Sequence, residues 1–113
     1  MLPMIDPQRF FEVEMRSGRI IEALPFEKAR KKAYKLRIDF GALGVRASSA
    51  QITELYTPEE LLGRTVVAVV NLPPKKIADF RSECLVLGID SPKGGVALLT
   101  VDDPDVPAGS RVY

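Results

Sequence analysis

The chain has 113 residues, 46% of them hydrophobic and 27% charged, which suits one globular domain around one core. It has no histidine and one cysteine, which excludes an internal disulfide, a zinc site of the usual Cys/His type and a histidine-dependent catalytic triad. The longest apolar run, residues 66–70, is too short to cross a bilayer, and the N-terminus has no signal-peptide pattern. We therefore expect a cytoplasmic protein that does not insert into membranes.

The formal net charge is only +1, but the charges are unevenly distributed. Seven basic residues stand between Lys28 and Arg46 against one acid, Asp39, whereas most acids lie near the two ends of the chain. An uneven field can steer an anionic partner even when the total charge is near zero. The simpler alternative is an ordinary solvated surface, where most Lys and Arg side chains lie.

The first quarter of the chain predicts a short helix followed by a long strand. Residues 1–5 are apolar, and Asp6-Pro7 is a typical helix start, so Phe10 and Phe11 are expected on a short helix that covers a neighbouring surface such as a second subunit. Residues 12–23 predict a strand in which Gly18 marks a bulge or tight bend. A loop is expected over residues 25–32.

Residues 33–40 alternate strictly between apolar and polar side chains, which predicts a second strand. The apolar residues at positions 34, 36, 38 and 40 share the face toward the core, and Lys35 and Arg37 share the face toward solvent. Residues 41–44 have a glycine at each end and suit a hairpin connection. A third strand follows over residues 45–52, with Arg46 and Ser48 facing the same way.

The second half of the chain predicts one short helix and further strands. Thr57-Pro58-Glu59-Glu60 is a helix start with a capping box, and Gly63 ends that helix. Residues 65–71 are apolar on both faces and predict a central strand. Two more strands are expected at residues 85–89 and 96–101, and the tail 106–113 is a candidate edge strand.

This order of elements favours an all-β fold, the OB-fold, which is a five-stranded Greek-key barrel with a helix between strands three and four. We expect residues 1–113 to form a single domain with short terminal extensions. The alternative is an unrelated barrel or sandwich.

Several separated motifs resemble the tRNA-binding domain attached to some methionyl- and phenylalanyl-tRNA synthetases. Residues 14–20, EMRSGRI, are similar to its opening strand, and Asn71-Leu-Pro-Pro74 with Ser82-Glu83 is similar to its later signature. Within that superfamily, residues 29–36 and 48–53 resemble the free-standing CsaA family. The resemblance covers roughly residues 10–113.

The resemblance implies an OB-fold, a homodimer joined through the terminal extensions, and two roles, and no cofactor is expected. One role is chaperoning or export support of unfolded or precursor polypeptides, and the other is binding of tRNA by shape. The rival interpretation is a dedicated tRNA-binding protein that assists aminoacylation or RNA folding. The chain departs from the tRNA-binding pattern at Ala50-Gln51 and Cys84-Leu85, and both departures weaken the transfer of tRNA contacts. Asp79 stands where CsaA proteins often have glycine, and it adds an acid beside Lys75 and Lys76 that should reduce the local affinity for anions.

The candidate RNA-binding residues are mainly cations that could contact phosphates, either from a mobile loop or from the face of the barrel. The polar residues of the later signature are added to them. They are Lys28, Arg30, Lys31, Lys32, Lys35, Arg37, Arg46, Asn71, Lys75, Lys76 and Ser82. With 7% aromatic residues and no tryptophan, stacking on single strands is disfavoured, and recognition of folded RNA by backbone and shape is the better hypothesis.

The candidate polypeptide-binding residues are apolar positions in loops or near strand ends, with a basic rim. They are Phe26, Pro73, Pro74, Ile77, Phe80 and Arg81. Ordinary packing of loops against the barrel end is the alternative for each residue alone.

Other constellations have structural explanations. Helix capping explains Glu59-Glu60, a solvated turn explains the acids at 102, 103 and 105, and Cys84 is expected to be a small buried hydrophobic residue. Ser48-Ser49 lacks a histidine base, so no catalytic residues are assigned and an enzyme is the least favoured class.

Overall fold

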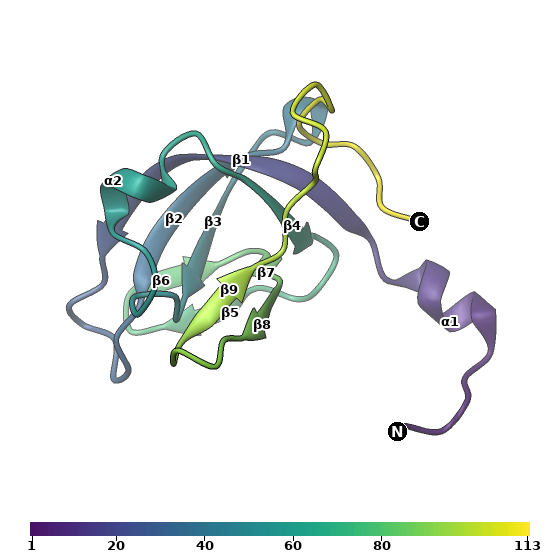
Figure 1. Ribbon diagram of the computed structural model, residues 1–113, viewed down its shortest axis with the longest axis horizontal. Coiled ribbons are helices and arrows are strands. Elements are labelled where there is room, and N and C mark those ends of the chain that lie inside the picture. Colours follow the sequence, from purple (N-terminus) through teal and green to yellow (C-terminus); the bar gives the residue numbers. More distant parts are fainter.

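The alternating segments form an antiparallel sheet that curls into a barrel. A computed structural model describes residues 1–113 and contains the strands β1 (Met15–Pro25), β2 (Tyr34–Asp39) and β3 (Val45–Ala50), which pair in sequence order (Figure 1). β4 (Thr65–Val69) pairs with the first half of β1, and β7 (Leu85–Val86) pairs with β4. The sheet order is therefore β3-β2-β1-β4-β7.

Contacts between β3 and the start of β7 bring the two edges of this sheet together. The Glu83 amide donates to the Ala47 carbonyl at 2.8 Å, and the Ser48 hydroxyl donates to the Cys84 carbonyl at 2.9 Å. The helix α2 (Pro58–Leu61) lies between β3 and β4 and buries Leu61 completely. The predicted OB-fold, a nearly closed five-stranded barrel with one helix at this position, is confirmed.

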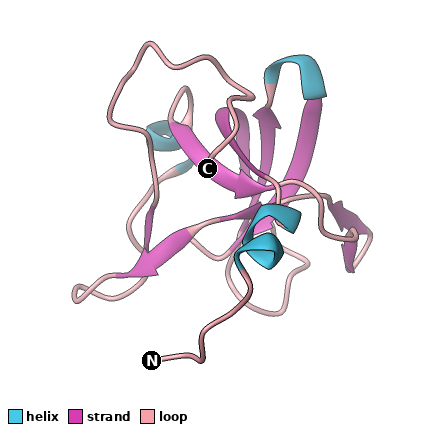
Figure 2. Cartoon of the chain, turned by 90° about the vertical axis from the view of Figure 1, so that its right-hand side faces the viewer, coloured by secondary structure: helices cyan, strands magenta, loops and turns pink.

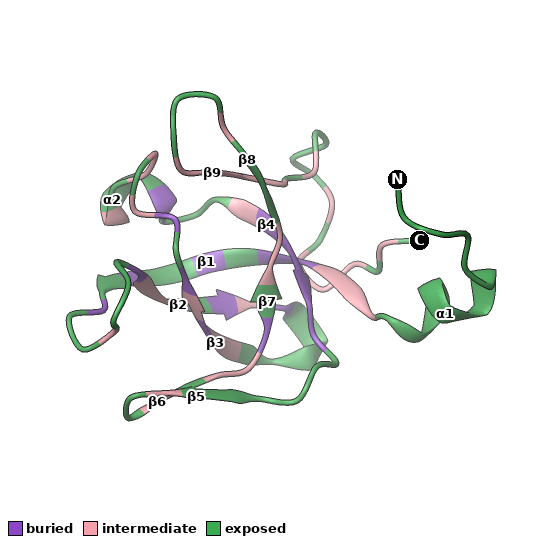
Figure 3. Cartoon of the chain, turned by 90° about the horizontal axis from the view of Figure 1, so that it is seen from below, coloured by how far each residue is buried: buried purple, intermediate pink, exposed green.

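The core consists of the inward positions of the alternating strands. Leu36, Ile38 and Phe40 are fully buried, while Arg37 on the opposite face is exposed, as the alternation predicts. β4 is buried from Val66 to its end, which confirms a central strand (Figure 3).

The predicted bulge lies elsewhere in β1. The register between β1 and β2 shifts between Ile20 and Glu22, so the irregularity is at Ile21, not Gly18. Gly18 is required for close packing instead, because a Cβ there would lie 2.6 Å from atoms of both Ile38 and Phe40. The bulge lies two residues after Arg19, the last residue of β1 that pairs with β4.

Both helix starts follow the predicted capping chemistry. The Asp6 carboxylate accepts from the Gln8 amide at 3.0 Å at the start of α1 (Pro7–Glu12), and Thr57 and Glu60 form a reciprocal capping box at α2. α1 contains no buried residue and projects from the barrel together with residues 1–6 (Figures 2 and 3). The strand predicted over residues 12–23 therefore begins later than expected, at Met15, because Glu12 belongs to α1. Neither helix is long enough to cross a bilayer.

Two hairpins complete the fold. β5 (Lys75–Ile77) and β6 (Phe80–Ser82) form a hairpin that the sequence analysis did not predict, and β8 (Gly88–Asp90) pairs with β9 (Val96–Leu98). The predicted strand 85–89 is interrupted at Leu87, whose amide donates to the Val67 carbonyl at 2.9 Å. The C-terminal tail runs beside β1, where Arg16 and Arg111 form one isolated bridge, and it forms no regular edge strand. A short 3₁₀ turn, Gly41–Leu43, joins β2 to β3.

Candidate nucleic-acid interface

The loop between β1 and β2, residues 26–33, is called here the basic loop. It meets the β5–β6 hairpin at the end of the barrel farthest from the two termini (Figure 1). Between them lies a groove of about 500 Å³, called here the basic groove. Its cations come from both segments. They are Lys28, Arg30 and Lys31 from the loop and Lys75 and Lys76 from β5. Two sequence-distant groups of predicted RNA contacts are therefore joined in one concave surface, as expected for the loops that flank the binding face of an OB-fold.

An ion pair and an aromatic pair connect the loop to the hairpin. Lys28 Nζ lies 3.0 Å from Asp79 Oδ2, and the rings of Phe26 and Phe80 are 5.3 Å apart. The hydrogen bond and the positive charge of Lys28 lower the pKa of Asp79 below its ordinary value, so the carboxylate stays ionised near neutral pH. Both side chains of the ion pair are largely exposed, so the pair contributes little to stability. Asp79 nevertheless neutralises the charge of Lys28, one of the cations of the basic groove.

Lys35 lies beneath this connection and does not project freely from the barrel face. Its Nζ is 4.8 Å from the ring centroid of Phe26 and 5.3 Å from that of Phe80, within the range of cation–π attraction. Lys35 therefore stabilises the position of the loop against the hairpin.

A second, apolar groove of about 430 Å³ adjoins the basic groove. Its floor contains the buried residues Ala50, Ile52 and Cys84, and its walls come from the chain around β5, β7 and β9. Burial raises the pKa of the Cys84 thiol to about 11, so the thiol is neutral, and the expectation of a small buried hydrophobic residue is confirmed. The two grooves share four lining residues: Ser49, Gln51, Lys75 and Ile77.

The prediction that Arg46 shares a surface with Lys35 and Arg37 is wrong. Arg46 pairs in register with the buried Ile38, so it belongs to the inward face together with Ser48. Its guanidinium donates to the Val70 carbonyl and contributes to the end of the barrel near α1. Arg37 is exposed on the outer face of β2, two residues beyond Lys35, and Lys32 is exposed on the loop side away from the basic groove.

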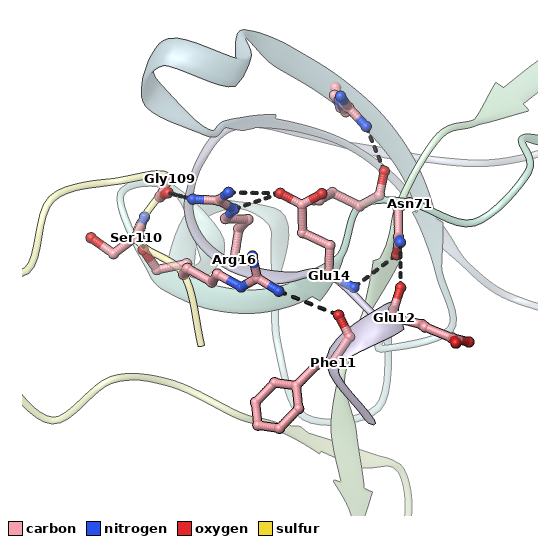
Figure 4. A network of polar contacts seen from close by, with 11 residues as sticks. Phe11, Glu12, Glu14, Arg16, Asn71, Gly109 and Ser110 are labelled. Carbon is pink, nitrogen blue, oxygen red and sulfur yellow. Dashed lines mark hydrogen bonds and ion pairs between the residues drawn. The ribbon is translucent and has the colours of Figure 1, made fainter. Parts of the chain in front are cut away.

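Asn71 lies at the base of α1, on the side of the barrel opposite the basic groove. Its side-chain carbonyl accepts from the Glu14 amide at 2.9 Å, and its side-chain amide donates to the Glu12 carbonyl at 2.7 Å (Figure 4). Arg16 forms a salt bridge with Glu14 at 2.7 Å and also donates to the carbonyl of Gly109 at 3.0 Å. Asn71 therefore fixes the start of β1 and does not line the basic groove.

The remaining predicted RNA contact, Ser82, lines the apolar groove, where its hydroxyl accepts from the Ser49 amide at 3.0 Å. Ser49 and Gln51 were not among the predicted site residues. Their position became visible only when β5 and β6 were found to form a hairpin opposite the end of β3.

The predicted polypeptide-binding residues do not form one surface. Phe26 is buried, so the expectation that it is exposed is wrong. Pro73 and Ile77 line the apolar groove. Pro74, Phe80 and Arg81 line a separate depression of about 380 Å³ along the β5–β6 hairpin.

Comparison with known proteins shows the family to which this chain belongs. Residues 15–111 match the family model described as "Putative tRNA binding domain", and the chain belongs to that family. Within the family it is similar to CsaA: the crystal structure of the chaperone CsaA from Bacillus anthracis is 44% identical with a TM-score of 0.91, covering 98% of this chain and 100% of that one. The CsaA chaperone protein of Picrophilus torridus is 45% identical with the same TM-score, covering 97% of this chain and 100% of that one.

The chain is also homologous to the C-terminal domain of methionyl-tRNA synthetases. It is 40% identical to the methionine–tRNA ligase of Methanocella arvoryzae over 111 residues, which cover 98% of this chain but only 16% of the ligase. The chain therefore spans a small part of these relatives.

Proposed function

We propose that this protein is a cytoplasmic, non-catalytic binding protein of the CsaA type that binds tRNA through the basic groove. The observation that supports the proposal most strongly is the convergence of five cations from the loop and β5 on one concave surface, where only Lys28 is paired with a carboxylate, that of Asp79. Membership of the tRNA-binding domain family and similarity to CsaA point the same way.

The groove suits the phosphate backbone of a folded RNA. Lysine and arginine side chains that neutralise phosphates release counterions, so each contact steepens the dependence of affinity on salt. With about five phosphate contacts, the affinity is expected to fall by about two orders of magnitude between 50 and 200 mM salt. The main cations come from a loop and a hairpin edge, which can follow the surface of a folded RNA without reading its base sequence.

Reversing charge on the loop tests this role. Arg30→Glu combined with Lys31→Glu should reduce tRNA affinity by about two orders of magnitude and flatten the salt dependence, because two loop cations that line the groove are replaced by anions beside the phosphates. Lys93→Glu, in the turn between β8 and β9, is the control and should leave tRNA affinity nearly unchanged. Equal losses in the loop and control variants would refute the assignment of the groove.

We also propose that the protein is a homodimer that uses its N-terminal segment. Residues 1–13 are exposed throughout, and they include Met4 at 91% and Phe11 at 53% relative exposure. Such contiguous apolar exposure is typical of an interface. Analytical ultracentrifugation of a chain lacking residues 1–9 should show a shift toward monomer; an unchanged dimer would dismiss this role for the segment.

A second candidate function is the binding of unfolded or precursor polypeptides, in support of folding or export. It is favoured by the depression beside the β5–β6 hairpin, where Phe80 and Pro74 adjoin the basic side chain of Arg81. The two similar CsaA proteins of known structure are named as chaperones. The loop variant that loses tRNA binding should still suppress aggregation of a denatured client, whereas Arg81→Glu should impair suppression. If both activities fell together in the loop variant, the two-surface picture would be wrong.

A further inference from the structure

The apolar groove opens directly into the basic groove, and the proposed function gives it no role. The two hollows share Ser49, Gln51 and Lys75, so a ligand whose phosphates lie on the cations of one can place an attached group in the other. The walls of the apolar groove come from β3, the β5–β6 hairpin and the chain around β7 and β9, so the groove is built from elements of the barrel.

The groove combines apolar walls with a few polar groups, which is the pattern of a small-molecule site. Its volume of about 430 Å³ suits a planar heterocycle. The Ser82 hydroxyl accepts from the Ser49 amide and retains its own proton for donation. The Gln51 amide and the Ser49 hydroxyl make no side-chain hydrogen bond within the protein, so three polar groups with unused capacity line the same groove.

We propose that this groove holds one unpaired nucleobase of the bound RNA while the phosphates next to it lie in the basic groove. This inference rests on the proposed tRNA binding and adds a contact that backbone recognition does not supply. The apolar side chains bury the faces of the base, and Gln51 and Ser82 hydrogen-bond its edge. The charge of the adjoining groove favours RNA over an apolar polypeptide, because a polypeptide has no regular anionic backbone to place on Lys75 and its neighbours.

Two oligonucleotides with equal phosphate numbers separate base binding from phosphate binding. Hexauridylate should bind the full chain about tenfold more tightly than a hexanucleotide of the same backbone without bases, because removing the faces of one base from water in an apolar groove adds about that factor. The salt dependence of the two affinities should be the same, since the number of phosphates is the same.

Substitution of Gln51 assigns the difference to the groove. Gln51→Ala should weaken hexauridylate by about threefold to tenfold, through the lost hydrogen bonds, and leave the baseless strand and the salt dependence unchanged. Gln8→Ala, at the only other glutamine and on the exposed surface of α1, is the matched control and should affect neither strand. Gln51 is exposed, so its truncation should not impair folding, and unchanged thermal unfolding confirms this.

The possible failures are distinguishable. If tRNA binds with strong salt dependence but the two hexanucleotides bind equally, the base-binding proposal is overturned and the tRNA-binding function stands. If tRNA itself fails to bind, the proposed function falls as well. If the two strands bind equally and an apolar peptide binds the wild type but not Gln51→Ala, the groove belongs to polypeptides, which also overturns the proposal.

Discussion

Removing the carboxylate of Asp79 should strengthen RNA binding. Asp79 Oδ2 lies 3.0 Å from Lys28 Nζ. In the free protein this carboxylate therefore pairs with a lysine that would otherwise be available to contact a phosphate. Asp79→Asn keeps the size of the side chain and removes its charge. Lys28 is then available to one more phosphate, and the local repulsion of the RNA backbone is removed.

The size of the effect follows from counterion release. One additional phosphate contact steepens the slope of log K against log salt by about 0.7 to 0.9, which corresponds to a gain of about fivefold to eightfold in affinity at 0.1 M salt. The gain should shrink as the salt concentration rises, because exposed charges are screened.

Fluorescence anisotropy of labelled tRNA at four or five salt concentrations measures both quantities. Asp102→Asn removes one exposed carboxylate from the chain leading to the C-terminal tail and is the charge-matched control. An equal gain in both variants would show a net-charge effect only, and no gain in Asp79→Asn would refute the claim that Lys28 is a phosphate contact.

Three further predictions concern packing, reactivity and the role assigned to Asn71. Gly18→Ala should lower the free energy of unfolding in urea by about 1–3 kcal/mol, because the new Cβ would clash with Phe40. Gly44→Ala meets no atom within 4 Å, but its φ of 85° and ψ of −171° are essentially restricted to glycine, so it should cost about 1–3 kcal/mol through backbone strain alone. Cys84 should resist iodoacetamide at pH 7.5 until the chain is unfolded, because burial raises the pKa of its thiol to about 11; rapid native alkylation would contradict this. Asn71→Ala should speed amide hydrogen exchange at the base of α1 and leave tRNA affinity unchanged, whereas a loss of affinity would restore it as an RNA contact.

The barrel could be predicted from the sequence because its strands and helix starts depend on local rules. The alternation over residues 34–40 determines which side chains are buried, and Thr57-Pro58 with Glu60 determines where α2 begins. These features depend on side-chain period and capping chemistry, which neighbouring residues specify without the rest of the fold.

The β5–β6 hairpin was missed because its turn lacks the usual signal. The turn residues are Ala78 and Asp79, and Ala78 takes a φ of 54°, a conformation in which glycine or asparagine is usual. The strands of this hairpin are three residues long, too short to show a clear period of two.

The candidate site was only partly predictable for a similar reason. The cations of the basic groove could be named from the charge run and from the lysines after Pro74, but their convergence depends on the hairpin. The positions of Arg46 and Asn71 outside the basic groove could not be predicted. Their hydrogen-bond partners, the Val70 carbonyl and the backbone of Glu12 and Glu14, are distant in the sequence.

The most direct test of the basic groove is lysine footprinting with and without tRNA. The full chain is acetylated briefly under both conditions, and the modification of each lysine is read by mass spectrometry. Binding in the basic groove predicts strong protection of Lys31, Lys75 and Lys76 and none of Lys93, which lies in the turn between β8 and β9. Protection of Lys93 with continued modification of the groove lysines would place the RNA on another face and contradict the account.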